Sequence, residues 1–186
     1  MQTLNIKSPV DEATIKKLRT GDQVLISGVI YVARDEAHNR IVAALNQGKP
    51  LPFALKGQTI YYMGPAPAKP GQAIGSAGPT TSGRMDAYSP RLIAEGLKVM
   101  IGKGRRSQAV KYAIKKYRAV YLAATGGAGA LISKSIKKAE VIAYPELGAE
   151  AVLRLEVENF PVVVVNDVYG GDLYQEGQAR YRSAVR

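Results

Sequence analysis

The 186-residue chain, with 46% hydrophobic and 22% charged residues, has the size and balance of one globular domain spanning residues 1–186. Because it has no Cys and a single His, His38, it excludes a disulfide framework, a Cys/His zinc site and thiolate ligation of an iron–sulfur cluster, so any such metal must be held elsewhere. The formal net charge of +11 indicates an acidic partner or an anionic substrate; nucleic acid is the weaker expectation, since no Trp and only two Phe accompany eleven Tyr.

Hydrophobic runs of strand length alternate with amphipathic stretches of helix length along the chain, which is the pattern of an α/β domain. Strands are predicted at residues 23–33, 59–64, 98–102, 119–124, 140–144, 151–157 and 161–167. Helices are predicted at residues 11–18, 35–47, 89–97, 107–117 and 129–138, and in the tail from residue 173. The basic residues are scattered, and most of them, including the GKGRR string at residues 102–106, are interpreted as solvated helix faces.

The first residues, MQTLNIKSPVDE, lack a basic region followed by an apolar core, so no secretory signal is expected. The longest apolar runs, such as residues 161–166, are far shorter than the roughly 20 residues that a membrane span needs. We therefore expect a soluble protein of the cytoplasm that does not contact a membrane.

One long irregular segment, residues 64–83, is rich in Pro and Gly and is the first candidate for a functional loop. It leads into the string GPTTSGRMD, which places the hydroxyls of Thr80, Thr81 and Ser82 where a helix would start. If this string is helical, Thr80 and Arg84 share a face, and the helix start favours an anion beside them. The structural alternative is an N-cap followed by a surface Arg.

Two further junctions between a strand and a helix carry cations, Arg34 after the first long strand and Lys103 between two glycines. Ligands of α/β sheets bind at the carboxyl ends of strands, so Arg34, Arg84 and Lys103 could converge on one dianion. Taken singly, Arg34 could equally pair with Asp35 or Glu36, and Lys103 could lie in a solvated turn.

The remaining polar candidates have weaker signals. The string TGGAGALIS from Thr125 lacks the residues of a phosphate-binding loop and is interpreted as a tight turn with close helix packing. His38 could act in acid–base chemistry, although a structural role is favoured. Asp86, Asn166 and Asp167 lie at predicted element ends, where they could orient a site or cap backbone groups.

Six strings resemble one known family in order and spacing: GDQVLISGVIYVARDEAH, GPAPAKPG, GPTTSGRMD, MIGKG, AATGGAGALIS and NFPVVVVNDVYG. The chain resembles the β subunit of two-subunit class I fumarate hydratases and L(+)-tartrate dehydratases, which is also the C-terminal domain of the single-chain enzymes. The likeness extends from about residue 21 to about residue 174, and GPTTSGRMD is its most specific string.

The resemblance implies a swivelling β/β/α fold with a mixed sheet, and an iron–sulfur hydro-lyase active only with an α subunit that holds the 4Fe-4S cluster, in an assembly of two α and two β chains. It also implies that Thr80 abstracts the proton and that Arg34, Arg84 and Lys103 hold the carboxylates of a small dicarboxylate. From the residues themselves, Thr81, Ser82, Asp86 and His38 are further candidates for supporting roles. Fumarate hydration to (S)-malate is the leading expectation. Tartrate dehydration to oxaloacetate stays open, as does a non-catalytic module that binds an anion or nucleic acid.

Overall fold

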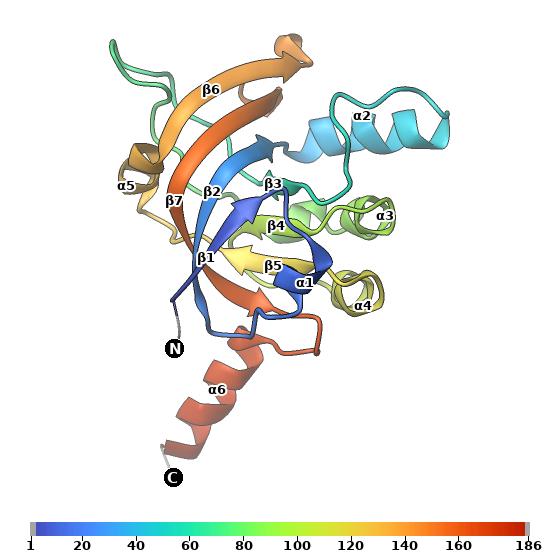
Figure 1. Ribbon diagram of the computed structural model, residues 1–186, viewed down its shortest axis with the longest axis vertical. Helices are drawn as coiled ribbons and strands as arrows, with labels where there is room; N and C mark the ends of the chain where they lie inside the picture. Colours follow the sequence, from blue (N-terminus) through green and yellow to red (C-terminus); the bar gives the residue numbers. More distant parts are fainter. Residues whose placement is uncertain (1–2, 185–186) are drawn as a thin grey trace.

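Seven strands form one mixed sheet in the order β1-β2-β3-β4-β5-β7-β6 (Figure 1). This computed structural model describes residues 3–184. The strands are β1 (Thr3–Ser8), β2 (Gln23–Val32), β3 (Thr59–Tyr61), β4 (Val99–Gly102), β5 (Val120–Ala123), β6 (Ile136–Ala143) and β7 (Val152–Asn166). Strands β1 to β5 pair in parallel, whereas β7 is antiparallel to β2, β5 and β6. The α/β class and the mixed sheet are thereby confirmed.

Because β2 also pairs with β7, strands β2, β3, β4, β5 and β7 form a closed ring of pairings, and the long β2 and β7 curve together (Figure 1). Successive residues of the short parallel strands enter two different cores. In β4, for example, Val99 and Ile101 belong to the first core and Met100 to the second, and all three are fully buried. This is the two-sided burial expected of parallel strands, and it explains their nearly continuous apolar sequence.

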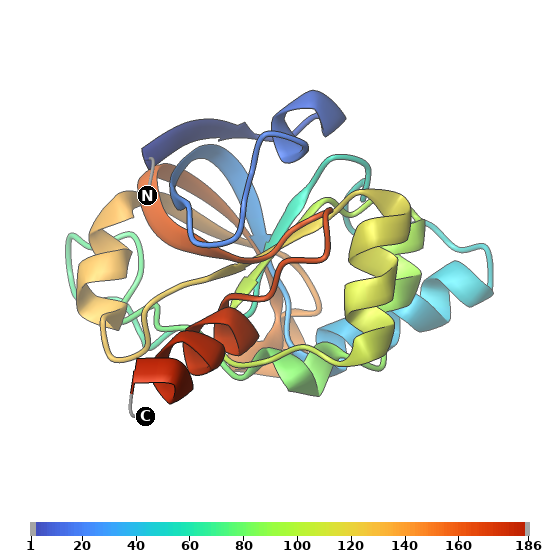
Figure 2. The same cartoon turned by 90° about the horizontal axis from the view of Figure 1, so that it is seen from below.

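Helices α2, α3 and α4 lie together on one side of the strands, as Figure 2 shows, and their buried hydrophobic residues belong to the second core. The helices are α1 (Glu12–Ile15), α2 (Asp35–Asn46), α3 (Ser89–Ala94), α4 (Gln108–Tyr117), α5 (Gly129–Ile132) and α6 (Leu173–Ala184), with short 3-10 helices η1 (Ser82–Met85), η2 (Ser133–Ser135) and η3 (Pro145–Glu150). Helix α6 projects away from the sheet (Figure 1). Within residues 3–184, no helix is both long and apolar enough to cross a membrane.

Strand β7 is the main departure from the predicted elements, because two predicted strands are one strand of 15 residues. The polar residues between the two apolar runs form a bulge, not a loop. At Asn159 the backbone has a positive φ of 51°, the register with β2 shifts, and the Asn159 N–H donates to Ser27 Oγ at 3.0 Å. Asn tolerates this left-handed conformation, and a bulge of this kind bends a strand without ending it.

Two other predictions of elements were wrong or incomplete. The predicted helix at residues 129–138 ends early, and its residues 136–138 join the strand predicted at residues 140–144 to form β6, because pairing with β7 overrides the local amphipathic pattern. Strand β1 was not predicted. It pairs in parallel with the first half of β2, and its inward residues Ile6 and Ser8 are buried.

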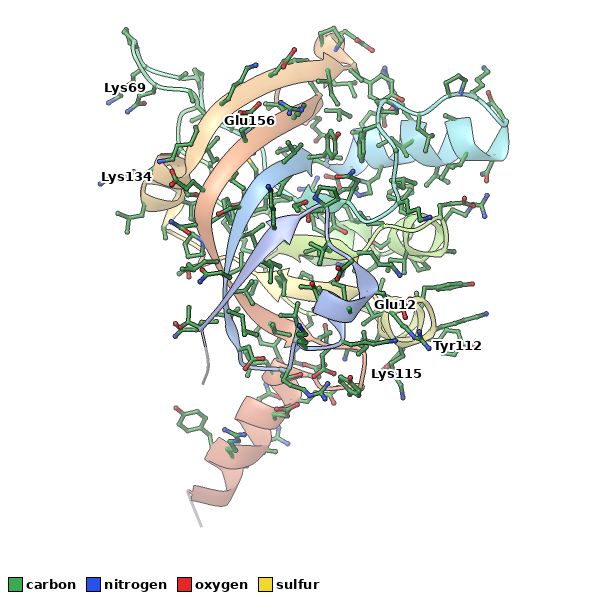
Figure 3. All side chains as sticks on the ribbon, viewed as in Figure 1. Glu12, Lys69, Tyr112, Lys115, Lys134 and Glu156 are labelled. Atoms are coloured by element: carbon green, nitrogen blue, oxygen red, sulfur yellow. The ribbon has the colours of Figure 1, made fainter. Side chains whose placement is uncertain are left out.

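The basic side chains do not form a single cluster. Lys69 and Lys134 project on one side of the molecule, whereas Lys115 of α4 projects on the opposite side (Figure 3). Most are exposed, in agreement with solvated faces, but Arg106 is buried with a relative exposure of 4%. The interpretation of the basic residues as mostly solvated therefore holds for most of them, and Arg106 is the exception within GKGRR.

Candidate active site

The carboxyl ends of β2, β3 and β4 meet at one edge of the sheet, since these strands are adjacent and parallel. Arg34 follows β2 at the residue that precedes α2, and Lys103 follows β4 directly. The chain returns to this edge after the Pro-rich segment and inserts Thr80 between Tyr62, which follows β3, and Lys103. The Thr80 N–H donates to Tyr62 O at 2.8 Å, and the Lys103 N–H donates to Thr80 O at 3.2 Å. Thr80 and Lys103 are thus held together by backbone pairing.

This pairing continues for one more residue and then gives way to η1. Thr81 forms a parallel bridge with Lys103, and the Ser82 N–H donates to Lys103 O at 2.9 Å. Thr80 therefore lies in extended backbone before the helix, and the hypothesis that Thr80 and Arg84 share a helix face is wrong. The predicted helix start does fall at Ser82, but η1 has only four residues and no side-chain cap. The position of Thr80 depends on strand pairing rather than on a helix dipole.

Asp35 joins the two arginines of the candidate site. Arg84 Nε lies 2.8 Å from Asp35 Oδ1, and Arg34 Nε lies 4.0 Å from Asp35 Oδ2. Arg34 Nη2 also lies 3.5 Å from Glu150 Oε1. The side chain of Arg34 is 19% exposed, against 50% for that of Arg84. Arg34 thus pairs with Asp35, as one structural alternative proposed, and with Glu150, which the sequence did not indicate, whereas no bond to Glu36 is formed within residues 3–184.

Gly64 shows how closely the end of β3 approaches Arg34, since a Cβ at Gly64 would lie 2.5 Å from Arg34 Nη1. Lys103 is exposed and passes Gly126, where an added Cβ would lie 3.7 Å from Lys103 Cδ. The three cations Arg34, Arg84 and Lys103 exceed the carboxylates Asp35 and Glu150 by one positive charge. The strand ends therefore bring four predicted residues, Thr80 and the three cations, to one edge with a net positive charge, which favours an anion there.

The glycines of the TGGAGALIS string serve close packing. Gly127 lies in a turn with φ of 80°, and an added Cβ at Gly129 would lie 2.8 Å from the backbone N of Gly78. The Ala77 N–H donates to Gly129 O at 3.1 Å. This loop supports the segment leading to Thr80, so the interpretation as a tight turn with close packing is confirmed.

Most of the Pro-rich loop lies away from this edge. Pro65 to Ala68, with Ala73 and Ile74, face β6 across a hollow of about 430 Å³. Lys69 projects from the outer end of this loop (Figure 3). Within the predicted functional segment, residues 64–83, Gly64 and the residues from Thr80 onward lie at the cationic edge. The middle of the segment lies apart from this edge and faces β6.

Two of the supporting candidates have structural partners. Ser82 is buried, and its Oγ lies 2.9 Å from the hydroxyl of Tyr121. Asp86 accepts from Arg106 Nε at 2.6 Å and from the N–H of Ser107 at 2.5 Å, at the residue that caps α4. Thr81, by contrast, is exposed beside Thr80. Ser82 and Asp86 therefore anchor the turn that carries Arg84.

Asn166 and Asp167 lie at the other end of the sheet. Strand β7 runs antiparallel to β2, so its carboxyl end lies beside the start of β2, far from Arg34. Asp167 accepts hydrogen bonds from the backbone N–H groups of Thr20, Tyr169 and Gly171. Backbone capping, one of the two predicted alternatives, is the role of Asp167.

Arg106 is the residue that sequence reasoning missed. Its guanidinium lies 5.3 Å from the ring centre of Tyr62 and 4.9 Å from that of Tyr121. Burial by itself would lower the pKa of Arg106, but the neighbouring Tyr62 and Asp86 outweigh burial and raise it. Nothing in the string GKGRR distinguishes Arg106 from the exposed Arg105, because the partners are remote in the sequence.

His38 is buried under the site and does not reach its surface. Its Nδ1 lies 2.8 Å from Arg34 O, and the ring of Tyr62 packs edge-on at 5.3 Å. Since a carbonyl only accepts, Nδ1 carries the proton of the neutral ring. Burial lowers the pKa of His38 to about 4. His38 therefore supports the backbone of Arg34 as a neutral structural histidine.

This depressed pKa predicts a specific loss of stability in mild acid. The unfolded chain binds the His38 proton near pH 6.5, whereas the folded chain binds it near pH 4, so stability falls as the pH decreases through this window. We expect a loss of about 2 kcal/mol between pH 7.5 and pH 5 from this group. Urea unfolding of wild type and His38→Gln at both pH values measures it. An equal pH dependence in the two proteins would contradict this role.

These features define an α/β domain that presents three cations and a threonine at the carboxyl ends of adjacent parallel strands. The chain belongs to the family described as Fumarase C-terminus, whose model matches residues 1–177, which confirms the resemblance. It is 41% identical over 177 residues to Fumarate hydratase 2 of Leishmania major, covering 93% of this chain and 31% of that protein. It is 40% identical over 179 residues to the aerobic class I fumarate hydratase of Escherichia coli (strain K12), covering 94% and 33%.

A relative of similar size is named for a different activity. The chain is 40% identical over 168 residues to the putative L(+)-tartrate dehydratase subunit beta of Methanocaldococcus jannaschii, covering 87% of this chain and 86% of that protein. By contrast, the chain spans about a third of the length of the fumarate hydratases that it matches. The relatives thus include both longer enzymes and a separate subunit.

Proposed function

We propose that this chain is the β subunit of a two-subunit hydro-lyase that catalyses the reversible hydration of fumarate to (S)-malate. The observation that carries the proposal is the placement of Thr80 between the ends of β3 and β4, beside Arg34, Arg84 and Lys103. The match to a subunit named beta over most of its length supports the separate subunit. In this proposal the domain is the swivelling β/β/α unit of the enzyme, spanning residues 1–186, and the enzyme is cytoplasmic.

The cations suit a small dicarboxylate. Guanidinium groups bind carboxylates through paired N–H donors, and the more exposed Arg84 is free to exchange part of its contact with Asp35 for a substrate carboxylate. Lys103 adds a mobile positive charge from the next strand end. These groups bind the substrate and also stabilise the negative charge that develops on a carboxylate when the neighbouring carbon loses its proton.

Thr80 is proposed to hold the proton that moves. Dehydration of malate removes a proton from the carbon beside one carboxylate and hydroxide from the next carbon, and hydration returns both. A threonine hydroxyl is a weak base at its ordinary pKa, so it needs adjacent positive charge. Arg84 and Lys103 can supply this charge, since their backbone segments adjoin that of Thr80.

The cluster that the family implies does not fit this chain. The sequence has no Cys, and residues 3–184 contain no group of three or more His, Cys, Asp or Glu side chains that could hold a metal ion. We therefore propose that a partner α subunit holds a 4Fe-4S cluster, in an assembly of two α and two β chains. The part of the site on this chain is a surface edge that the α subunit would complete.

A second candidate function is dehydration of L(+)-tartrate to oxaloacetate as the β subunit of a tartrate dehydratase. The observation in its favour is the relative of matching length that carries this name. Tartrate differs from malate by one hydroxyl, and the same cations would hold its carboxylates. Selectivity would then depend on the few groups that face that hydroxyl, some of them on the partner.

The test is anaerobic hydro-lyase activity of this chain alone, of a candidate α subunit alone, and of the two mixed, with fumarate followed by absorbance and tartrate tested in parallel. We expect activity only in the mixture, with turnover faster for fumarate than for tartrate. Activity of this chain alone would contradict the assignment of the cluster to a partner. An inactive mixture with a verified intact cluster would contradict the hydro-lyase proposal.

A further inference from the structure

The buried guanidinium of Arg106 lies beneath the candidate site and joins its two halves. The first half is the threonine turn, residues 80–86, and the second is the lysine turn, residues 103–107. Their amino-terminal ends are linked by the bridge between Thr81 and Lys103. Their carboxyl-terminal ends are linked by Arg106 Nε, which donates to Asp86 Oδ1 at 2.6 Å. The side chain of Arg106 has no exposure to solvent, so it cannot contact a substrate.

Each nitrogen of this guanidinium has a defined neighbour. Nη2 donates to Ser89 Oγ at 2.7 Å, and Nη1 lies 3.6 Å from Met100 Sδ. The rings of Tyr62 and Tyr121 lie within cation–π distance. A desolvated cation with this many directed contacts is held in one conformation, so it can fix the positions of the side chains that it contacts.

The neighbours of Arg106 contact Thr80 and the two turns that carry Arg84 and Lys103. The carbonyl of Tyr62 accepts the N–H of Thr80. The hydroxyl of Tyr121 donates to Gly104 O at 2.9 Å and accepts from Ser82 Oγ at 2.9 Å, so it contacts both turns. Asp86 also accepts from the Ser107 N–H at the start of α4. Arg106 therefore contacts the tyrosine whose carbonyl holds Thr80, the tyrosine that spans the two turns, and the carboxylate that ends the first turn.

We propose that Arg106 is a positioning residue, which sets the placement of Thr80 and Arg84 relative to Lys103 by bonding Asp86 and Ser89 while it packs beside the rings of Tyr62 and Tyr121. The inference rests on the proposed hydro-lyase function and deepens it. An arginine is required because its planar fork bonds Asp86 and Ser89 at once and packs against aromatic rings. A lysine would keep the charge but bond fewer of these groups.

The test compares Arg106→Lys with Arg105→Lys in the complex with the α subunit. Arg105 is the exposed neighbour of Arg106, so its substitution makes the same chemical change without removing the bonds of Arg106 to Asp86 and Ser89. Displacement of reacting groups by about 1 Å can reduce turnover about 100-fold. We expect Arg106→Lys to lower kcat by roughly this factor with a smaller change in KM, and Arg105→Lys to stay within about threefold of wild type. A kcat of Arg106→Lys within the same threefold range would overturn the proposal.

A second readout does not depend on activity. In the isolated chain, the backbone amide NMR signals of Thr80, Thr81, Arg84 and Lys103 should move or broaden in Arg106→Lys and remain unchanged in Arg105→Lys. Unchanged signals in Arg106→Lys would overturn the positioning role even if the hydro-lyase function failed. If the amide signals change in Arg106→Lys but the wild-type complex is inactive, the positioning role of Arg106 is retained and the hydro-lyase function is rejected.

A milder variant covers the case in which Arg106→Lys does not fold. Ser89→Ala removes the partner of Nη2 and leaves the pair of Arg106 with Asp86. We expect Ser89→Ala to show the same direction of change, with kcat about tenfold lower and the same four amide signals displaced. Wild-type kinetics and unchanged amide signals in Ser89→Ala would overturn the proposal, whatever the state of Arg106→Lys.

Discussion

Replacing Thr80 with Ala in the assembled enzyme is expected to lower kcat by roughly 100- to 10,000-fold, the range for loss of a general acid–base group, with KM for fumarate nearly unchanged. The backbone of Thr80 is held by Tyr62 and Lys103 through its own N–H and C=O, so removal of the side chain leaves the turn in place. Only the hydroxyl that would hold the proton is lost. Steady-state kinetics under anaerobic conditions measure the effect.

Thr80→Ser is the matched control for this prediction, because it keeps the hydroxyl and removes only a methyl group. We expect Thr80→Ser to retain activity within about tenfold of wild type. Equal and small effects of Ala and Ser would reject the proton-transfer role. A raised KM with unchanged kcat in Thr80→Ala would indicate a binding role instead.

Replacing Arg34 with Ala is expected to lower kcat and to raise KM, with kcat/KM falling about 100-fold or more. Loss of a hydrogen bond to a charged group costs about 1.5–3 kcal/mol, which is roughly a 10- to 100-fold effect. The loss also leaves Asp35 and Glu150 without this cation, so repulsion of a dianionic substrate increases. Turnover should fall as well, because the same cation stabilises the charge that develops during proton removal.

Arg34→Lys and Arg40→Ala are the controls for Arg34→Ala. Lys keeps the charge without the fork and should give an intermediate loss. Arg40 lies on α2, the helix that begins directly after Arg34, and pairs with Glu36 and Glu146 at the surface, so its removal should leave kcat and KM close to wild type. If Arg40→Ala and Arg34→Ala reduced activity equally, the effect would belong to the helix and not to the site.

The amino-acid sequence determined the class of the fold through local signals. Apolar runs of strand length predicted β2, β4 and β5 to within one or two residues, and α2 and α4 follow the predicted boundaries closely. For α4, Ser107 caps the first turn by accepting the N–H of Val110, a signal that is readable in the string itself. The absence of Cys determined that this chain cannot supply thiolates to a cluster.

The candidate site was also accessible from the sequence in part. Cations at strand ends and the GPTTSGRMD string were enough to select Arg34, Thr80, Arg84 and Lys103, because parallel strands carry their carboxyl ends to one edge. The local conformation at Thr80 was not accessible. Its N–H and C=O pair with Tyr62 and Lys103, and these long-range bonds override the helical tendency of the residues that follow.

Only the tertiary structure decided the features that depend on distant partners. The closed ring of strands requires β2 to pair with β7, more than a hundred residues away, and the same pairing makes one strand of two predicted ones. Pairing of β6 with β7 draws residues 136–138, predicted as the end of a helix, into the strand predicted at residues 140–144. The burial of Arg106 required Tyr62, Asp86 and Tyr121 to surround it. Hydrophobic periodicity and helix capping depend on residues a few positions apart, so both can be predicted from the sequence. The energy of burying a charge or closing a sheet depends on neighbours that only folding brings together.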